Sequence, residues 1–171
     1  MAAIKIMLVD DHELVRQGLR TILELEEDIL VINEFDNGRV FLERLEGAEE
    51  YPDIVVMDIE MPYLSGIETT QRLKEVAPQI QVIALSAVDK DSTIAQMLMA
   101  GACGYVIKSS AASDLVHAIR AAHAGESAVN EEIRKRVNRF KERRSEQQKG
   151  GLLTKREIEV MSILVQGYSN K

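Results

Sequence analysis

The sequence predicts an α/β fold in which one five-stranded parallel sheet is doubly wound, with helices on both faces. Short aliphatic runs alternate with helix-length segments five times along the chain. Most of these runs lack polar alternation, which is typical of parallel strands buried on both faces. Strand, helix and strand in repeated order favour a parallel sheet over a meander of hairpins.

Five apolar runs are predicted as strands, and the segments between them carry helical stripes. The strand runs are Ile4–Val9, Ile29–Asn33, Ile54–Met57, Gln81–Leu85 and Gly104–Ile107. Apolar residues at a spacing of about 3.6 predict amphipathic helices. These are Leu14, Val15, Leu19, Ile22 and Leu23, then Ile67, Thr70 and Leu73, then Ile94, Met97 and Leu98, and finally Leu115, Val116 and Ile119.

Length and charge indicate one full domain followed by a smaller second segment. The chain has 171 residues, of which 46% are hydrophobic and only 4% aromatic, so its core is built from aliphatic side chains. Residues 1–130 contain 22 acidic and 10 basic side chains, whereas residues 131–171 contain 6 and 11. A basic segment after an acidic body is compatible with a module that meets nucleic acid or with a solvated linker. Charge alone favours the linker.

Cysteine usage and hydropathy point to the cytoplasm. Cys103 is the only cysteine, which excludes a disulfide within the chain and fits a reducing compartment. Its neighbours Ala102 and Gly104 favour a small buried thiol over a nucleophile. No apolar run approaches the roughly 20 residues needed to span a bilayer, and no secretion signal is evident. We therefore expect a cytoplasmic protein without membrane association.

Chemically reactive side chains stand where four of the predicted strands end. Asp10 and Asp11 follow the first strand, Asp58 ends the third, Ser86 the fourth and Lys108 the fifth. In a parallel sheet these ends meet at one edge, where ligands of such folds bind. Any one of these residues alone could be a strand-end cap or a surface charge. The whole set at successive strand ends predicts a site.

The crowding of three carboxylates at that edge requires positive charge. Two carboxylates about 4 Å apart repel by roughly 4 kcal/mol at an effective dielectric near 20. A hard divalent cation with oxygen ligands offsets this repulsion, and Mg²⁺ suits a site with few carboxylates and several waters. Lys108 would add a second positive charge.

Four stretches closely resemble the receiver domain of two-component response regulators, which has a flavodoxin-like fold. They are "MLVDDHELVRQGL", "VVMDIEMPYLSGIE", "VIALSA" and "GACGYVIKSS", and the resemblance covers about residues 4–124. It implies that Asp58 accepts a phosphoryl group from a sensor histidine kinase. It also implies no enzymatic activity apart from self-phosphorylation and dephosphorylation at Asp58.

The resemblance also assigns roles around Asp58. It implies a Mg²⁺ site formed by Asp10, Asp11, Asp58 and the main-chain carbonyl of Glu60. Ser86 would hydrogen-bond one phosphoryl oxygen and Lys108 would pair with another. This agrees with phosphoryl transfer, in which catalysis is mainly positioning and charge neutralisation.

A switch follows from the same resemblance. Phosphate would draw Ser86 towards Asp58, and the aromatic ring of Tyr105 would fill the space left behind; the alternative is that Tyr105 is an ordinary, half-exposed strand tyrosine. The side chain of Glu60 could lean over the site or point to solvent. His12, one of three scattered histidines, does not by itself indicate a metal site.

The tail suggests a second module. We expect a receiver domain over 1–126, a partly helical linker over 127–150 and, over 151–171, the start of a LuxR-type (NarL/FixJ-like) helix-turn-helix domain. In the linker, Ile133, Val137 and Phe140 follow helical spacing. In the last segment, Thr154 and Glu157 form a capping box before an apolar stripe. The stripe comprises Ile158, Met161, Leu164 and Val165.

The helix that would enter the major groove is not reached before Lys171. We therefore expect a fragment of a transcription factor with no complete set of DNA-binding residues. Promoter DNA would be a partner of the full-length protein only. A homodimer is possible, since dimers are common in the resembling family.

Two other functions remain open at this point. One is a Mg²⁺-dependent phosphohydrolase with Asp58 as nucleophile, although Ile59 and Glu60 follow where such enzymes often show Asp-x-Asp, and no cap insertion is evident. The other is a receiver that acts through protein contacts alone, with the tail serving as a dimer element.

Overall fold

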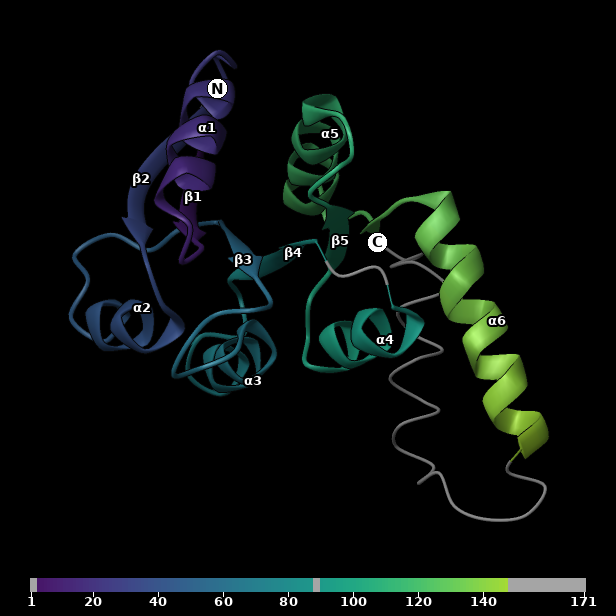
Figure 1. The fold of residues 1–171 in the computed structure, drawn as a ribbon. Coiled ribbons are helices and arrows are strands. Elements are labelled where there is room, and N and C mark those ends of the chain that lie inside the picture. Colours follow the sequence, from purple (N-terminus) through teal and green to yellow (C-terminus); the bar gives the residue numbers. More distant parts are fainter. Residues whose placement is uncertain (1–2, 88–89, 148–171) are drawn as a thin grey trace.

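A computed structural model describes residues 3–87 and 90–147, and they form a parallel sheet between two layers of helices (Figure 1). The strand order is β2-β1-β3-β4-β5-β6. The strands are β1 (Ile4–Val9), β2 (Ile29–Phe35), β3 (Ile54–Asp58), β4 (Gln81–Ser86), β5 (Gly104–Ile107) and β6 (Ala128–Val129). The predicted fold class is thus confirmed, and every strand pair is parallel.

The number of strands is corrected from five to six. β6 pairs with β5 in the register Gly104↔Ala128 and Tyr105↔Val129. Two residues are too few to show a period, and they fall within the 127–150 segment predicted as linker. Gly104 makes the pairing possible, because a Cβ atom there would lie 2.8 Å from Cβ of Ala128. The sheet therefore extends past the boundary expected at residue 126.

The helices cover the sheet on both faces. They are α1 (Glu13–Leu23), α2 (Gly38–Leu45), α3 (Gly66–Val76), α4 (Asp91–Met99), α5 (Ala112–His123) and α6 (Glu131–Gln147). In Figure 1, α1 and α5 lie on one side of the sheet and α2, α3 and α4 on the other. Two apolar clusters fill the spaces between these layers. Within the described residues, no helix is both long enough and apolar enough to cross a membrane.

The loop between β3 and α3 is tightly closed, and this fixes the end of β3. Ser65 caps α3 in a capping box with Glu68. The amide of Gly66 donates a hydrogen bond of 2.9 Å to the carbonyl of Ile59. A Cβ atom on Gly66 would lie 1.9 Å from the carbonyl oxygen of Asp58, so only glycine permits this approach.

Residues 131–147 of the predicted linker form one helix, α6. Its start is capped by Asn130, whose side-chain oxygen accepts a 2.8 Å hydrogen bond from the amide of Ile133. The three residues that were predicted to share one face of this helix do so: Ile133 and Val137 are buried, and Phe140 packs against the same apolar cluster. The predicted helix-turn-helix start over 151–171 lies outside the described residues.

Replacing Gly66 with alanine tests the closure of this loop. We expect Gly66→Ala to lower the free energy of unfolding by about 1–3 kcal/mol, because the new methyl group meets rigid backbone. Urea denaturation measures this. Gly18→Ala is the matched control, since its Cβ meets nothing within 4 Å in the middle of α1 and should stabilise that helix by up to about 1 kcal/mol. Equal midpoints for the two variants would contradict the expected close contact.

Candidate functional site

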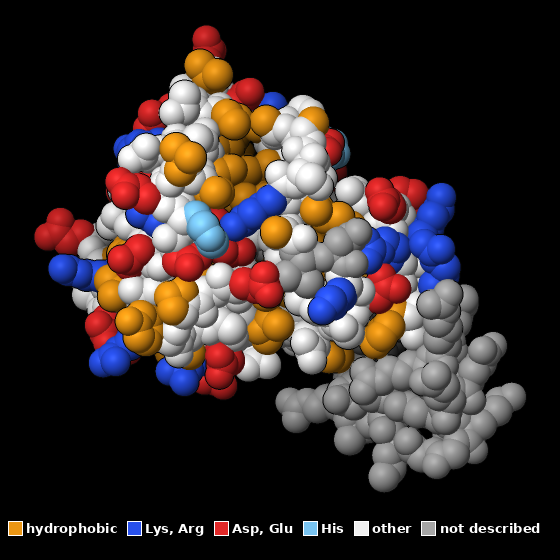
Figure 2. Space-filling view, viewed as in Figure 1, with side chains coloured by type: hydrophobic (Ala, Val, Ile, Leu, Met, Phe, Trp, Pro, Cys, Tyr) orange, Lys and Arg blue, Asp and Glu red, His pale blue; other side chains and the backbone are white. Residues whose placement is uncertain are grey.

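The predicted site residues come together at the carboxyl edge of the sheet. Asp10 directly follows β1, Asp58 ends β3, Ser86 ends β4 and Lys108 directly follows β5. Strand order reverses between β1 and its neighbours β2 and β3, so the crevice lies at a topological switch point. Near the middle of the face drawn in Figure 2, acidic side chains gather beside a histidine and a basic side chain.

One ammonium group joins two buried carboxylates. Lys108 Nζ lies 2.7 Å from Oδ2 of Asp10 and 3.0 Å from Oδ2 of Asp58. Asp10 and Asp58 are only 2% and 3% exposed, and the Lys108 side chain is 18% exposed. The other oxygen of Asp58, Oδ1, accepts a 2.8 Å hydrogen bond from the amide of Ile59. Breaking this arrangement by removing the lysine would leave two buried charges without compensation.

The pKa values reflect this balance. Burial, and next the charge of Asp10, raise the pKa of Asp58, while Lys108 and the Ile59 amide oppose that rise. Burial lowers the pKa of Lys108, but its hydrogen bonds and charge interactions with Asp10 and Asp58 together outweigh burial, so the pKa of Lys108 is raised. The lysine is therefore a permanent cation of the site at neutral pH.

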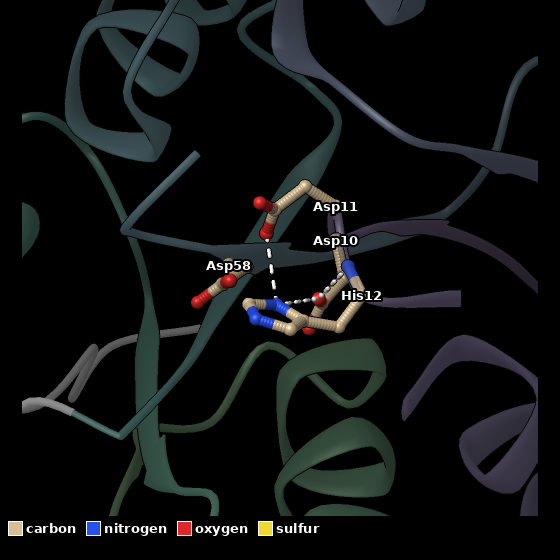
Figure 3. A group of neighbouring side chains, drawn as sticks. All are labelled: Asp10, Asp11, His12 and Asp58. Atoms are coloured by element: carbon tan, nitrogen blue, oxygen red, sulfur yellow. Dashed lines mark hydrogen bonds and ion pairs between the residues drawn. The ribbon is translucent and has the colours of Figure 1, made fainter. Parts of the chain in front are cut away.

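His12 lies between the two carboxylates of the first strand end, as Figure 3 shows. Its Nδ1 is 2.9 Å from Oδ1 of Asp11 and 3.2 Å from Oδ1 of Asp10. Its amide also donates a 2.9 Å hydrogen bond to Oδ1 of Asp10. The sequence did not point to His12 as a site residue, because three scattered histidines do not indicate a metal site. The one signal that could have found it is its position directly after Asp10 and Asp11.

The donor set fits a hard divalent cation. Carboxylate oxygens of Asp10, Asp11 and Asp58 and a ring nitrogen of His12 all lie within 4.8 Å of one another. Oδ2 of Asp10 and Oδ1 of Asp11 are buried but accept no well-aligned hydrogen bond; their contacts are the ion pairs with Lys108 and His12. A compact group of carboxylate oxygens is the kind of ligand set that Mg²⁺ takes in proteins.

Ser86 and Tyr105 form a buried pair behind the acidic group. Both residues are fully buried, so the tyrosine is not the half-exposed strand residue that was the alternative prediction. Burial is the main cause that raises the pKa of Tyr105, and a side-chain hydrogen bond with Ser86 opposes it. Ala87, next to Ser86, is exposed and so is Glu60.

Arg16 supports the site, and the sequence gave no reason to single it out. Its Nη1 donates a 2.5 Å hydrogen bond to the main-chain carbonyl of Asp10. Its Nε lies 3.8 Å from Oε2 of Glu34, whose Oε1 is 2.6 Å from Nη1 of Arg20. This network ties the end of β1 to α1 and β2. Only the fold brings Glu34 and Arg16 together, so no local spacing rule could have found it.

Comparison with known proteins identifies the family. The profile of the response regulator receiver domain matches residues 6–120. The chain belongs to the response regulator receiver family. Response regulator protein VraR of Staphylococcus epidermidis is 34% identical over 169 residues, which cover 99% of this chain and 79% of that protein. VraR of Staphylococcus aureus strain COL is also 34% identical, with 98% and 78% covered.

Solved response regulators share the fold. A LuxR-family two-component response regulator from Aurantimonas sp. SI85-9A1 superposes with a TM-score of 0.75 at 30% identity, covering 82% of this chain and 99% of that one. The receiver domain of a putative NarL from Mycobacterium tuberculosis gives 0.68 at 27% identity, covering 73% and 99%. The resemblance inferred from the four motifs is confirmed, and the phosphohydrolase alternative is not favoured.

The raised pKa of Asp58 predicts that its charge destabilises the metal-free protein. When the folded pKa lies above the unfolded one, the stabilising contribution is present below the unfolded pKa and is lost as pH rises through the folded pKa. Asparagine keeps the shape without the charge. At neutral pH with a chelator present, we therefore expect Asp58→Asn to unfold at a higher urea concentration than wild type.

This advantage should narrow as the pH falls towards 3.8, the ordinary carboxyl value. Urea titrations at several pH values provide the measurement. Asp36→Asn is the control, because Asp36 is exposed just beyond β2 and its Oδ1 accepts a hydrogen bond from the side-chain amide of Asn37. A midpoint for Asp58→Asn at or below wild type at neutral pH would refute the expected sign.

Proposed function

We propose that this protein is a phosphorylation-switched response regulator that accepts a phosphoryl group on Asp58 from a sensor histidine kinase and controls transcription. The observation that carries the proposal is the Asp58 carboxylate, buried at the switch-point crevice and held 3.0 Å from Lys108 Nζ beside the Asp10 and Asp11 carboxylates. A nucleophile, a fixed cation and a set of cation ligands are the parts that phosphoryl transfer needs.

In this proposal Asp58 is the nucleophile. A carboxylate oxygen forms a bond to phosphorus as the bond from phosphorus to the donor's nitrogen breaks, and the product is an acyl phosphate. Lys108 is already oriented by Asp10 and Asp58 and would pair with a phosphoryl oxygen without further reorganisation. The hydroxyl of Ser86 would donate to another oxygen. The same residues would support loss of the phosphoryl group to water.

Mg²⁺ is the proposed cofactor. Asp10, Asp11, Asp58 and the main-chain carbonyl of Glu60 would hold it. When bound, the ion neutralises charge on the transferring phosphoryl group. His12, which contacts both Asp10 and Asp11, would then help to orient those two carboxylates.

Phosphorylation would act through Ser86 and Tyr105. The added phosphate brings about 1.5 to 2 negative charges and strong acceptor oxygens to the end of β3. If Ser86 turns towards it, the hydrogen bond with Tyr105 must change, and both groups are buried in a packed core. Packed cores repack between discrete arrangements rather than deform continuously. The face around α4 and β5 would carry that change.

The output side of the proposal rests on the relatives. The matched response regulator from Aurantimonas sp. SI85-9A1 is of the LuxR family, which supports a LuxR-type helix-turn-helix module beginning near 151, a linker over 127–150 and a receiver over 1–126. The proposed partners are a histidine kinase, promoter DNA for the full-length protein and a second copy in a homodimer. Response regulators are generally cytoplasmic, and we expect the same here.

A small acyl-phosphate donor tests the proposal. Incubation with acetyl phosphate and Mg²⁺ should add the mass of one phosphoryl group to wild type, and a chelator should abolish it. Asp58→Asn should show no adduct, while the control Asp36→Asn should match wild type. Lys108→Ala should slow the reaction by about 100-fold, the usual effect of losing one charge-stabilising group. An unchanged adduct on Asp58→Asn would refute the assignment of Asp58.

A further inference from the structure

Helix α6 is seated on α4, against the side of the receiver that carries Tyr105. Ile133 and Val137 of α6 are almost fully buried in one cluster with Ile94 and Met97 of α4. Tyr105 belongs to the same cluster. Figure 1 shows α6 beside α4, on the side of the sheet where β5 lies. The linker helix is thus part of the receiver's core on this side.

An ion pair fixes the orientation of α6 on α4. Nε and Nη2 of Arg136 lie 2.9 Å and 2.8 Å from Oδ1 of Asp91, the first residue of α4. The side chains of Arg136 and Asp91 are 14% and 31% exposed. By contrast, Arg134 and Lys135 contact Glu131 within α6 at 4.0 Å and 3.8 Å. A partly buried, close pair is worth more than such exposed contacts.

Two routes connect this contact to the phosphoryl site. Along the chain, Ser86 ends β4 and Asp91 begins α4 five residues later. Through packing, Tyr105 contacts Ser86 on one side, and on the other its strand pairs with Val129, two residues before α6 begins. Ser86 is thus linked along the chain to the start of α4, and through Tyr105 to the core beneath α6.

We propose that α6 is a phosphorylation-sensitive latch, docked on α4 when Asp58 is unmodified and released when Asp58 is phosphorylated. This inference rests on the proposed function. Withdrawal of Ser86 towards the phosphate changes the Ser86–Tyr105 contact and displaces the first turn of α4 with Asp91. The Arg136–Asp91 ion pair then loses its alignment, and Ile133 and Val137 lose part of their packing against α4.

The coupling must be reciprocal. If phosphorylation weakens docking by some factor, the undocked protein must favour the phosphorylated state over the docked protein by that same factor. Arg136→Gln and Asp91→Asn remove the ion pair without touching the site residues. Lys135→Gln is the matched control, because it removes a charge from the same helix turn at a side chain that is 68% exposed.

Hydrogen exchange on the full chain tests the latch. Samples with and without acetyl phosphate are read for intact mass and for amide exchange over 131–140. We expect phosphorylation to speed exchange in this segment by about fivefold or more. Arg136→Gln and Asp91→Asn should show faster exchange before phosphorylation and a larger phosphorylated fraction at equilibrium, and Lys135→Gln should match wild type. A charge swap, Asp91→Arg with Arg136→Asp, should restore protection.

The outcomes separate the latch from the proposed function. An adduct with unchanged protection over 131–140 overturns the latch and leaves phosphorylation at Asp58 standing. The latch is also overturned if Arg136→Gln and Asp91→Asn show the same amide exchange and the same phosphorylated fraction as the control Lys135→Gln. Absence of an adduct on wild type overturns the proposed function and the latch together.

Discussion

Lys108 Nζ lies between the carboxylates of Asp10 and Asp58, 2.7 Å from one and 3.0 Å from the other, and the site depends on this contact. Asp10 and Asp58 are only 2% and 3% exposed, so the cost of burying two like charges side by side must be offset by a nearby cation. The lysine supplies that charge, and so keeps Asp58 available as a nucleophile while Asp10 and Asp11 retain lone pairs for a metal. Because Lys108 is already in position before the phosphoryl group arrives, no reorganisation of this charge is needed during transfer.

The three residues of this contact lie at the carboxyl ends of three different strands, β1, β3 and β5, so the contact forms only when the sheet is assembled. Parallel pairing brings these strand ends to one edge, and the order β2-β1-β3-β4-β5-β6 opens a crevice beside β1. Gly66 lets α3 begin directly against the carbonyl of Asp58, and Arg16 holds the carbonyl of Asp10. The site is rigid because both carboxylates stand on strand ends that neighbouring elements secure.

The sequence predicted most of what depends on local pattern. Buried strands read as aliphatic runs, and polar residues such as Asp58 and Ser86 stand out where those runs end. What could not be predicted depends on contacts between distant residues. β6 is two residues long and exists because Gly104 admits it. Arg16 and Glu34, or Asp91 and Arg136, become neighbours only through the fold, and His12 matters only because its ring turns back onto the acids.

The central claim is that Lys108 is held as a cation by two buried carboxylates rather than neutralised by its own burial. The most direct measurement is the pKa of the Lys108 ammonium by ¹⁵N NMR titration in the metal-free protein. Burial alone would bring that pKa below the ordinary lysine value of 10.5, whereas pairing with Asp10 and Asp58 raises it above that value. We expect the raised pKa, and a loss of the rise in the Asp10→Asn, Asp58→Asn double variant. A wild-type pKa at or below 10.5 would contradict the account.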